Sequence, residues 1–204
     1  MINFYKTVKN QFKALQNRIK ATLHSKQQYN DALVIYKNPH LFSEVDRAWA
    51  FWVSTNQAFS SNIGAGWSYG RKKNQAPKTT YHKRERFENH YAKRLELVSL
   101  DCRDALEVIQ KRDAKESFFY VDPPYFNADQ GHYKGYTEAD FQRLLDILVN
   151  IQGKFLLSSY PSELLDSYQQ QYEWEQRSLH TTIRLKQHHK PKTEVLTANY
   201  PLEV

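Results

Sequence analysis

The sequence predicts an α/β fold, and two observations carry that prediction. Over residues 1–96 the apolar residues recur at spacings of three and four, as they do along one face of an α-helix. Over residues 97–204 short apolar runs alternate with amphipathic stretches, which is typical of a parallel sheet that is buried on both faces. We therefore expect a helical region at 1–96 and an α/β portion at 97–204.

The composition excludes several classes of protein. Of the 204 residues, 40% are hydrophobic and 14% are aromatic, which is too rich for a disordered chain. The mean hydropathy is −0.78, and no apolar run approaches the roughly 18 residues that span a bilayer. The first residues lack the apolar core of a signal peptide, and a single cysteine excludes an intrachain disulfide framework. We expect a cytoplasmic protein with no membrane partner.

Three helices are expected within the first 60 residues. Ser25 and Ser43 each precede an amphipathic stretch and carry the signature of an N-cap. Asn38-Pro39 is expected to end the helix between them. The first helix has a continuous apolar stripe formed by Phe4, Val8, Phe12, Leu15 and Ile19, and the third places Val45, Ala48, Trp49 and Trp52 inward.

A glycine-rich loop and a basic helix are expected next. Residues 61–80 are predicted to form a loop, because three of the six glycines fall within seven positions there. The glycines are Gly64, Gly66 and Gly70, and the helix after them has an apolar ridge of Phe87, Tyr91 and Leu95.

Positive charge is concentrated in this part of the chain. Residues 71–94 contain nine basic and two acidic side chains, a net charge of +7 that equals the formal charge of the whole chain. Such a concentration on a neutral body indicates a polyanionic partner. A solvated helix face is the alternative.

Five short strands are expected in the second half. Thr137 begins a capping box ahead of one helix, and Pro161 fits the first helical position of another. In a parallel sheet the ligand site lies beyond the carboxyl ends of the strands. The expected strands are residues 97–100, 118–121, 155–158, 174–179 and 195–200.

One motif stands at such a strand end. The sequence Phe118-Phe119-Tyr120-Val121 is followed by Asp122-Pro123-Pro124-Tyr125. Each proline fixes φ near −65° and donates no N–H, so the turn is stiff and its carbonyl oxygens can accept from a ligand. A turn with a packing tyrosine is the alternative reading.

The motif resembles the catalytic motif of the Dam-type adenine-N6 DNA methyltransferases. Similarity to that family extends along most of the chain. It includes the segment 3–8, the segment 48–67 (which is similar to phage members of the family), Asp104-Ala105-Leu106-Glu107, and Thr193-Glu194-Val195-Leu196-Thr197-Ala198-Asn199-Tyr200. The resemblance implies an incomplete Rossmann-like methyltransferase sheet with a helical DNA-recognition region.

The resemblance also implies a reaction and a site. The lone pair of adenine N6 is delocalised into the ring, and hydrogen bonds from N6 to the Asp122 carboxylate and the Pro123 carbonyl would favour a pyramidal nitrogen facing the methyl donor. Pro124 stiffens the turn, and Tyr125 offers a face on which a flipped adenine stacks. The implied cofactor is S-adenosylmethionine, near Asp104 and Asp122; an N-cap role is the alternative for Asp104. No metal is required.

Double-stranded DNA is the partner that the resemblance implies. Positive side chains in the basic segment would neutralise phosphates, and aromatic ones would stack near the flipped base. For any single one of these residues a role in solubility is the alternative. The candidate DNA-binding residues are Trp67, Arg71, Lys72, Lys73, Lys83 and Arg84, and a second basic cluster lies at 184–192.

The sequence lacks the family's lysine-bearing cofactor motif and its Phe-x-Gly-x-Gly strand end. The glycines at 64–70 follow a helix, so we assign them to the DNA side. In the family's sheet two strands lie between those at 97–100 and 118–121, so we expect unpaired edges there. Three explanations are open: a second polypeptide that supplies the cofactor segment, a truncated reading frame, or a decayed prophage remnant.

Rival functions follow from these alternatives. A catalytically inactive DNA-binding remnant is the main one, and a methyltransferase acting on RNA adenine or protein glutamine is another. The target DNA sequence, the oligomeric state and the biological role, whether restriction-modification, phage protection or regulation, are not legible in the sequence.

Overall fold

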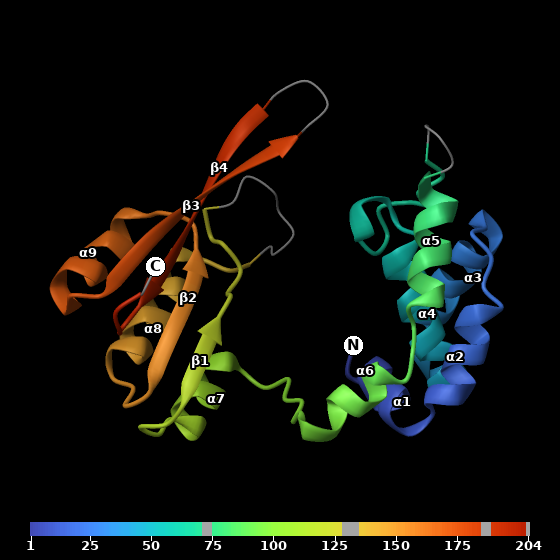
Figure 1. The fold of residues 1–204 in the computed structure, drawn as a ribbon, viewed down its shortest axis with the longest axis horizontal. Coiled ribbons are helices and arrows are strands. Elements are labelled where there is room, and N and C mark those ends of the chain that lie inside the picture. Colours follow the sequence, from blue (N-terminus) through green and yellow to red (C-terminus); the bar gives the residue numbers. More distant parts are fainter. Residues whose placement is uncertain (71–74, 128–134, 185–188, 203–204) are drawn as a thin grey trace. The chain divides into compact units, whose positions relative to one another are not determined.

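The computed structural model describes residues 1–70, 75–127, 135–184 and 189–202, and side chains outside residues 180–192. The contacts divide the chain into two compact units, Met1–Cys102 and Arg103–Val204 (Figure 1). Each unit has its own core of buried side chains.

The first unit is helical. Ser25 and Ser43 cap α3 and α4 as predicted, because each side chain accepts a hydrogen bond from a backbone N–H in the first turn. The helices are α1 (Ile2–Asn10), α2 (Phe12–Lys20), α3 (Lys26–Lys37), α4 (Glu44–Asn56), α5 (Gln75–Glu85) and α6 (His90–Arg94), with short 3-10 turns at Pro39–Leu41, Phe59–Ser61 and Leu95–Leu97.

Helix α4 is the centre of this unit and contacts α1, α2 and α3. Its buried face carries Trp49, Trp52 and Val53. The indole N–H of Trp49 donates to Thr22 Oγ1 at 2.8 Å, so the polar edge of this buried ring is satisfied. The inward residues predicted for this helix are confirmed, except that Val45 is only half-buried.

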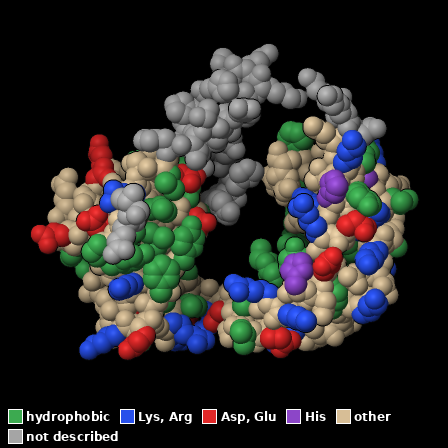
Figure 2. Space-filling view, viewed as in Figure 1, with side chains coloured by type: hydrophobic (Ala, Val, Ile, Leu, Met, Phe, Trp, Pro, Cys, Tyr) green, Lys and Arg blue, Asp and Glu red, His purple; other side chains and the backbone are tan. Residues whose placement is uncertain are grey.

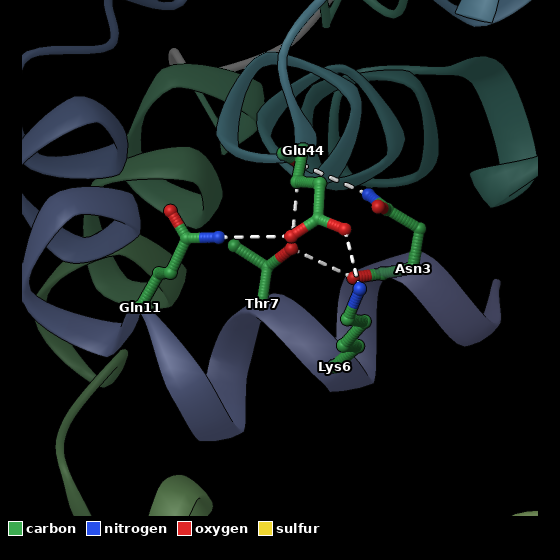
Figure 3. A network of polar contacts seen from close by, with 5 residues as sticks. All are labelled: Asn3, Lys6, Thr7, Gln11 and Glu44. Atoms are coloured by element: carbon green, nitrogen blue, oxygen red, sulfur yellow. Dashed lines mark hydrogen bonds and ion pairs between the residues drawn. The ribbon is translucent and has the colours of Figure 1, made fainter.

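The single first helix that the apolar stripe predicts is wrong, because the structure breaks it at Gln11. Gln11 adopts φ −134° and ψ 36° and donates its side-chain N–H to Glu44 Oε2 at 2.9 Å. Glu44 also pairs with Lys6 at 2.5 Å, and its main-chain oxygen accepts from Asn3 at 3.0 Å (Figure 3). The network ties the start of α4 to α1 and to the break.

Two further predictions for the first unit need correction. Residues 75–80 were expected in a loop but form the first half of α5, with Pro77 at the third position, where its missing N–H has no intrahelical partner in any case. The ridge of Phe87, Tyr91 and Leu95 does not lie on one helix. Phe87 lies between α5 and α6, and Leu95 follows α6.

The strand expected at residues 97–100 is also wrong. Leu97 ends a 3-10 turn, and the segment after it pairs with no strand in the part of the chain that the structure describes. Leu97 is 97% exposed. A strand needs a neighbour to satisfy its backbone groups, and the described sheet provides none here.

The second unit is a four-stranded sheet with helices. Its strand order is β1-β2-β4-β3 (Figure 1). β1 and β2 are parallel, as predicted, but β4 is antiparallel to both β2 and β3, so the sheet is mixed. The elements are α7 (Ala105–Arg112), β1 (Phe118–Val121), α8 (Glu138–Val149), β2 (Lys154–Ser159), α9 (Glu163–Tyr172), β3 (Glu175–Arg184) and β4 (His189–Ala198).

One face of the sheet carries the core of the second unit. Val121, Phe155 and Leu157 point into a cluster shared with α7, α8 and α9. Phe118 and Tyr120 alternate with the core residues of β1 and are 55% and 62% exposed. Hydrophobic side chains gather on the visible face of this unit (Figure 2). The expectation of a sheet buried on both faces is therefore wrong for the described residues.

The helices α8 and α9 of the second unit begin at side-chain caps. Thr137 and Asp140 form the predicted capping box of α8, whose inward residues Phe141, Leu144, Leu145 and Leu148 are buried. The N-cap of α9 is Ser162, so Pro161 precedes the helix and is not its first residue. Among the described residues no helix is long and apolar enough to cross a membrane.

Candidate active site

The candidate site lies where β1 and its parallel neighbour β2 end. β1 ends at Val121, which pairs with Leu157 of β2. Because the strands are parallel, Asp122 and Ser158 follow at the same edge of the sheet. Asp122 is exposed, whereas Ser158 is buried.

Tyr125 contacts both of these residues. Its hydroxyl donates to Asp122 Oδ1 at 3.2 Å and lies 3.1 Å from Ser158 Oγ. The centroid of its ring lies 4.5 Å from that of Tyr160, with 53° between the ring planes. The motif thus brings a carboxylate, a phenol and two aromatic rings together.

Contacts behind the motif hold it in place. Phe126 packs against Phe141 of α8 with ring centroids 5.3 Å apart. The side-chain N–H of Asn127 donates to the Pro161 carbonyl at 3.0 Å. Together with the fixed φ of the two prolines, these contacts make a stiff turn.

The environment of Tyr125 keeps its hydroxyl protonated. Its pKa is raised above the usual 10.0, chiefly because burial disfavours the phenolate, and the charges of Asp122 and Glu194 raise it further, against the opposing hydrogen bond from Ser158. The neutral phenol is a donor to Asp122 Oδ1. Asp122 Oδ2 accepts no hydrogen bond from any described residue, so it is available to a ligand.

Comparison with known proteins agrees with this chemistry. The family described as D12 class N6 adenine-specific DNA methyltransferase matches residues 1–183 of the 204. The chain belongs to this family. A search of curated proteins finds no match. Membership confirms the resemblance to Dam-type enzymes and identifies a DNA methyltransferase directed at adenine N6, in a family that uses S-adenosylmethionine.

In this D12 class methyltransferase, Asp104 is the N-cap of α7. Its Oδ1 accepts from the backbone N–H groups of Leu106 and Glu107 at 2.9 and 3.4 Å. The geometry matches the capping alternative, and Asp104 is an exposed residue. A role toward the cofactor stays a prediction.

S-adenosylmethionine fits the described residues only in part. Its sulfonium is cationic, and the exposed carboxylate of Asp122 is a suitable neighbour for that charge. Only Gly135 and Gly153 are described among the glycines of the second unit, so no Gly-x-Gly turn lies among these residues. At Gly153 a Cβ would lie 2.6 Å from the Ser117 carbonyl oxygen, which is structural packing and no ligand cradle. No group of three metal-ligating side chains is found among the described residues either.

Trp67 forms an isolated antiparallel β-bridge with Ala58 and contacts the segment between α2 and α3. Its indole N–H donates to Gln57 Oε1 at 3.2 Å, and its ring stacks on His24 at 4.9 Å. Gln57 is fully buried and also bonds to Ser25 N and the Leu23 carbonyl. Burial lowers the pKa of His24. Trp67 is half-buried, so only part of the ring could meet DNA.

Lys83 and Arg84 are neighbours on α5 but lie in different surroundings. Arg84 donates to the Thr22 carbonyl at 2.9 Å and lies over the Tyr81 ring at 5.5 Å. Lys83 lines a pocket of the first unit. Lys and Arg side chains are spread over the visible face of this unit (Figure 2). Arg71, Lys72 and Lys73, and the side chains of the basic cluster at 184–192, lie outside the described residues.

Sequence reasoning missed Ser158 and Tyr160. Ser158 lies at the carboxyl end of β2, 33 residues beyond Tyr125 in the chain, and Tyr160 follows that strand. The signal was the polar and aromatic run Ser158-Ser159-Tyr160 at the carboxyl end of a predicted parallel strand.

Proposed function

We propose that this chain transfers the methyl group of S-adenosylmethionine to N6 of an adenine flipped out of duplex DNA and held at the end of β1. The observation that carries the proposal is the exposed Asp122 carboxylate, 3.2 Å from the Tyr125 hydroxyl, beside the Tyr125 and Tyr160 rings. Membership in the D12 class indicates that the target atom is adenine N6.

The proposed role of the motif is to position the amine. Adenine N6 is a poor nucleophile, because its lone pair is delocalised into the ring. Asp122 Oδ2 and the Pro123 carbonyl each accept one N6–H bond, which favours a pyramidal nitrogen. When bound, S-adenosylmethionine would supply an electrophilic methyl group and leave as the neutral thioether, S-adenosylhomocysteine. The Asp122 carboxylate would compensate the positive charge that develops on nitrogen until one N6 proton is released to solvent.

The aromatic rings support an extrahelical base. The amino group of adenine is paired within the duplex, so the base has to leave the stack before it can react. Stacking on Tyr125 is expected to contribute about 1–3 kcal/mol per base. Phosphate contacts are assigned to the basic segment of the first unit, where Lys83 is the described candidate, and a cytoplasmic location belongs to the same proposal.

A second polypeptide segment is proposed for the cofactor's glycine turn. One edge of β1 pairs with β2, and the other edge is unpaired in the described part of the chain. A strand added along this edge would satisfy the backbone N–H and C=O groups there. An inactive DNA-binding remnant is the alternative, favoured by the absence of a Gly-x-Gly turn from the described second unit.

The experiment is to incubate adenine-containing duplex DNA with the chain and isotopically labelled S-adenosylmethionine, and to analyse the digested nucleosides by mass spectrometry. The proposal predicts label in N6-methyladenine alone. Label in methylcytosine would contradict the assigned target. No label, combined with retained DNA binding and no cofactor binding in a titration, would support the remnant.

A further inference from the structure

A pocket in the first unit has no part in the proposed reaction. Its volume is about 500 Å³, within the roughly 300–1,000 Å³ of pockets that take small organic groups. All of its lining residues lie between positions 4 and 95, so it belongs to the first unit, whereas Asp122 belongs to the second.

The inner surface of the pocket is aromatic and held in place. Trp52 and Phe87 are buried, and the Phe87 ring stacks on Tyr91 at 5.9 Å with 25° between the planes. Gln16 donates its side-chain N–H to the Phe87 carbonyl at 2.9 Å, which fixes the backbone there. Tyr91 is 43% exposed. The Phe87 ring is stacked on both Phe12 and Tyr91, so a planar group that enters meets Tyr91 as the exposed and already ordered ring.

The rim of the pocket is cationic. Lys83, Arg86 and Arg94 all line it, and none of the three pairs with an acid among the described residues. The three nearby acids in the sequence have other partners: Glu85 lies 3.6 Å from Arg84, Glu88 lies 4.0 Å from His90, and Glu96 lies 3.5 Å from Lys9. The rim thus offers uncompensated positive charge next to apolar rings.

Asn56 adds a polar group to the lining. Its side-chain nitrogen donates to the Trp52 carbonyl at 2.7 Å, which orients the amide. Its Oδ1 accepts no hydrogen bond from any described residue. An amide oxygen that lines a pocket beside aromatic rings can accept from the edge of a base.

We propose that this pocket binds an unpaired nucleotide of DNA, with the base against Tyr91 and the adjoining phosphates at Lys83, Arg86 and Arg94. Aromatic stacking combined with a positive rim is the general pattern of single-strand recognition. The cations come from α5, α6 and the segment between them, on an open rim that suits a phosphate chain. The site is separate from the methyl-transfer chemistry.

The test compares two labelled DNA duplexes by fluorescence anisotropy, without cofactor. One is fully paired, and the other carries a single bulged thymidine. The full chain is expected to bind the bulged duplex about tenfold more tightly. Tyr91→Ala and Arg94→Gln should each remove most of that preference. Lys93→Gln is the matched control, because it makes the same charge change one residue away on α6, outside the pocket.

Lys93→Gln should weaken binding to both duplexes equally and keep the preference. Equal affinity of the unaltered chain for the two duplexes, or a preference that survives Tyr91→Ala and Arg94→Gln, would overturn the proposal. So would free thymidine monophosphate that binds as tightly as the bulged duplex. Arg94 is exposed, so its variant tests the site even if Tyr91→Ala misfolds. Because the bulge carries thymine, failure here leaves the adenine chemistry standing.

Discussion

Tyr125 has two separable functions in this account. Its hydroxyl orients the Asp122 carboxylate, and its ring offers a stacking surface. Tyr125→Phe removes only the hydroxyl, so we expect kcat to fall about 2- to 12-fold, as for the loss of one hydrogen bond. Tyr125→Ala also removes the ring, and kcat/KM should fall by a further 5- to 150-fold. Steady-state methylation kinetics measure both, and equal losses in the two variants would contradict the division.

Lys83 and Arg84 give a second prediction at this scale. Arg84→Gln removes a charged hydrogen bond to Thr22, so we expect about 1–2 kcal/mol lower free energy of unfolding. Lys83→Gln should change the free energy of unfolding by less than about 0.5 kcal/mol. It should reduce the slope of log K for DNA binding against log salt concentration by about one. Urea unfolding measures the stability of both variants, and DNA binding at several salt concentrations measures the salt slope. A loss of stability in Lys83→Gln together with a reduced salt slope in Arg84→Gln would contradict the roles assigned to the two residues.

The site residues differ in how far the sequence could reveal them. Asp122 and Tyr125 were predictable, because one contiguous motif contains both. Ser158 and Tyr160 were marked only by a polar and aromatic run at a predicted strand end, because their proximity to Tyr125 depends on which strands pair. Lys83 and Arg84 look equivalent in sequence, yet successive helical residues point about 100° apart, so one is oriented toward the Thr22 carbonyl.

Among the elements, the start of α8 gives a prediction for pH dependence. Asp140 accepts from the side chain and backbone of Thr137 and pairs with Arg143, and these contacts lower its pKa from 3.8 to about 2. The stabilisation is present above pH 3.8 and is lost as the pH falls toward 2. We expect Asp140→Asn to lower Tm at pH 7 and to have little effect at pH 2.

Thermal melts at several pH values measure this difference. Glu138→Gln is the control, because it lies in the same first turn and has no hydrogen-bond role in the capping box. A Tm difference for Asp140→Asn that persists unchanged from pH 7 to pH 2 would contradict the cause assigned to the lowered pKa.

Helix starts that depend on neighbouring residues could be predicted from the sequence. Breaks and strands that depend on residues far away in the chain could not. The caps at Ser25, Ser43 and Thr137 are fixed by neighbouring residues, and all three are confirmed. The break at Gln11 depends on Glu44, which lies 33 residues away. The strand expected at 97–100 has the right composition, but the described sheet offers it no neighbour.

For the whole molecule, the separate cores predict that the first unit folds alone. Residues 1–102 contain a complete buried cluster around α4. We expect this fragment to show a helical circular dichroism spectrum, to melt cooperatively, and to keep salt-sensitive DNA binding. A fragment without cooperative melting would show that the first unit depends on residues 103–204.

Methyl transfer by Asp122→Ala is the direct test of whether Asp122 holds the reacting amine. We expect N6-methyladenine formation to be lost while DNA affinity stays within about twofold, because Asp122 is exposed and lies outside the basic segment. Asp166→Ala, an exposed change on α9, is the control and should keep full transfer. An unaffected methylation rate in Asp122→Ala would show that another group holds the adenine amine.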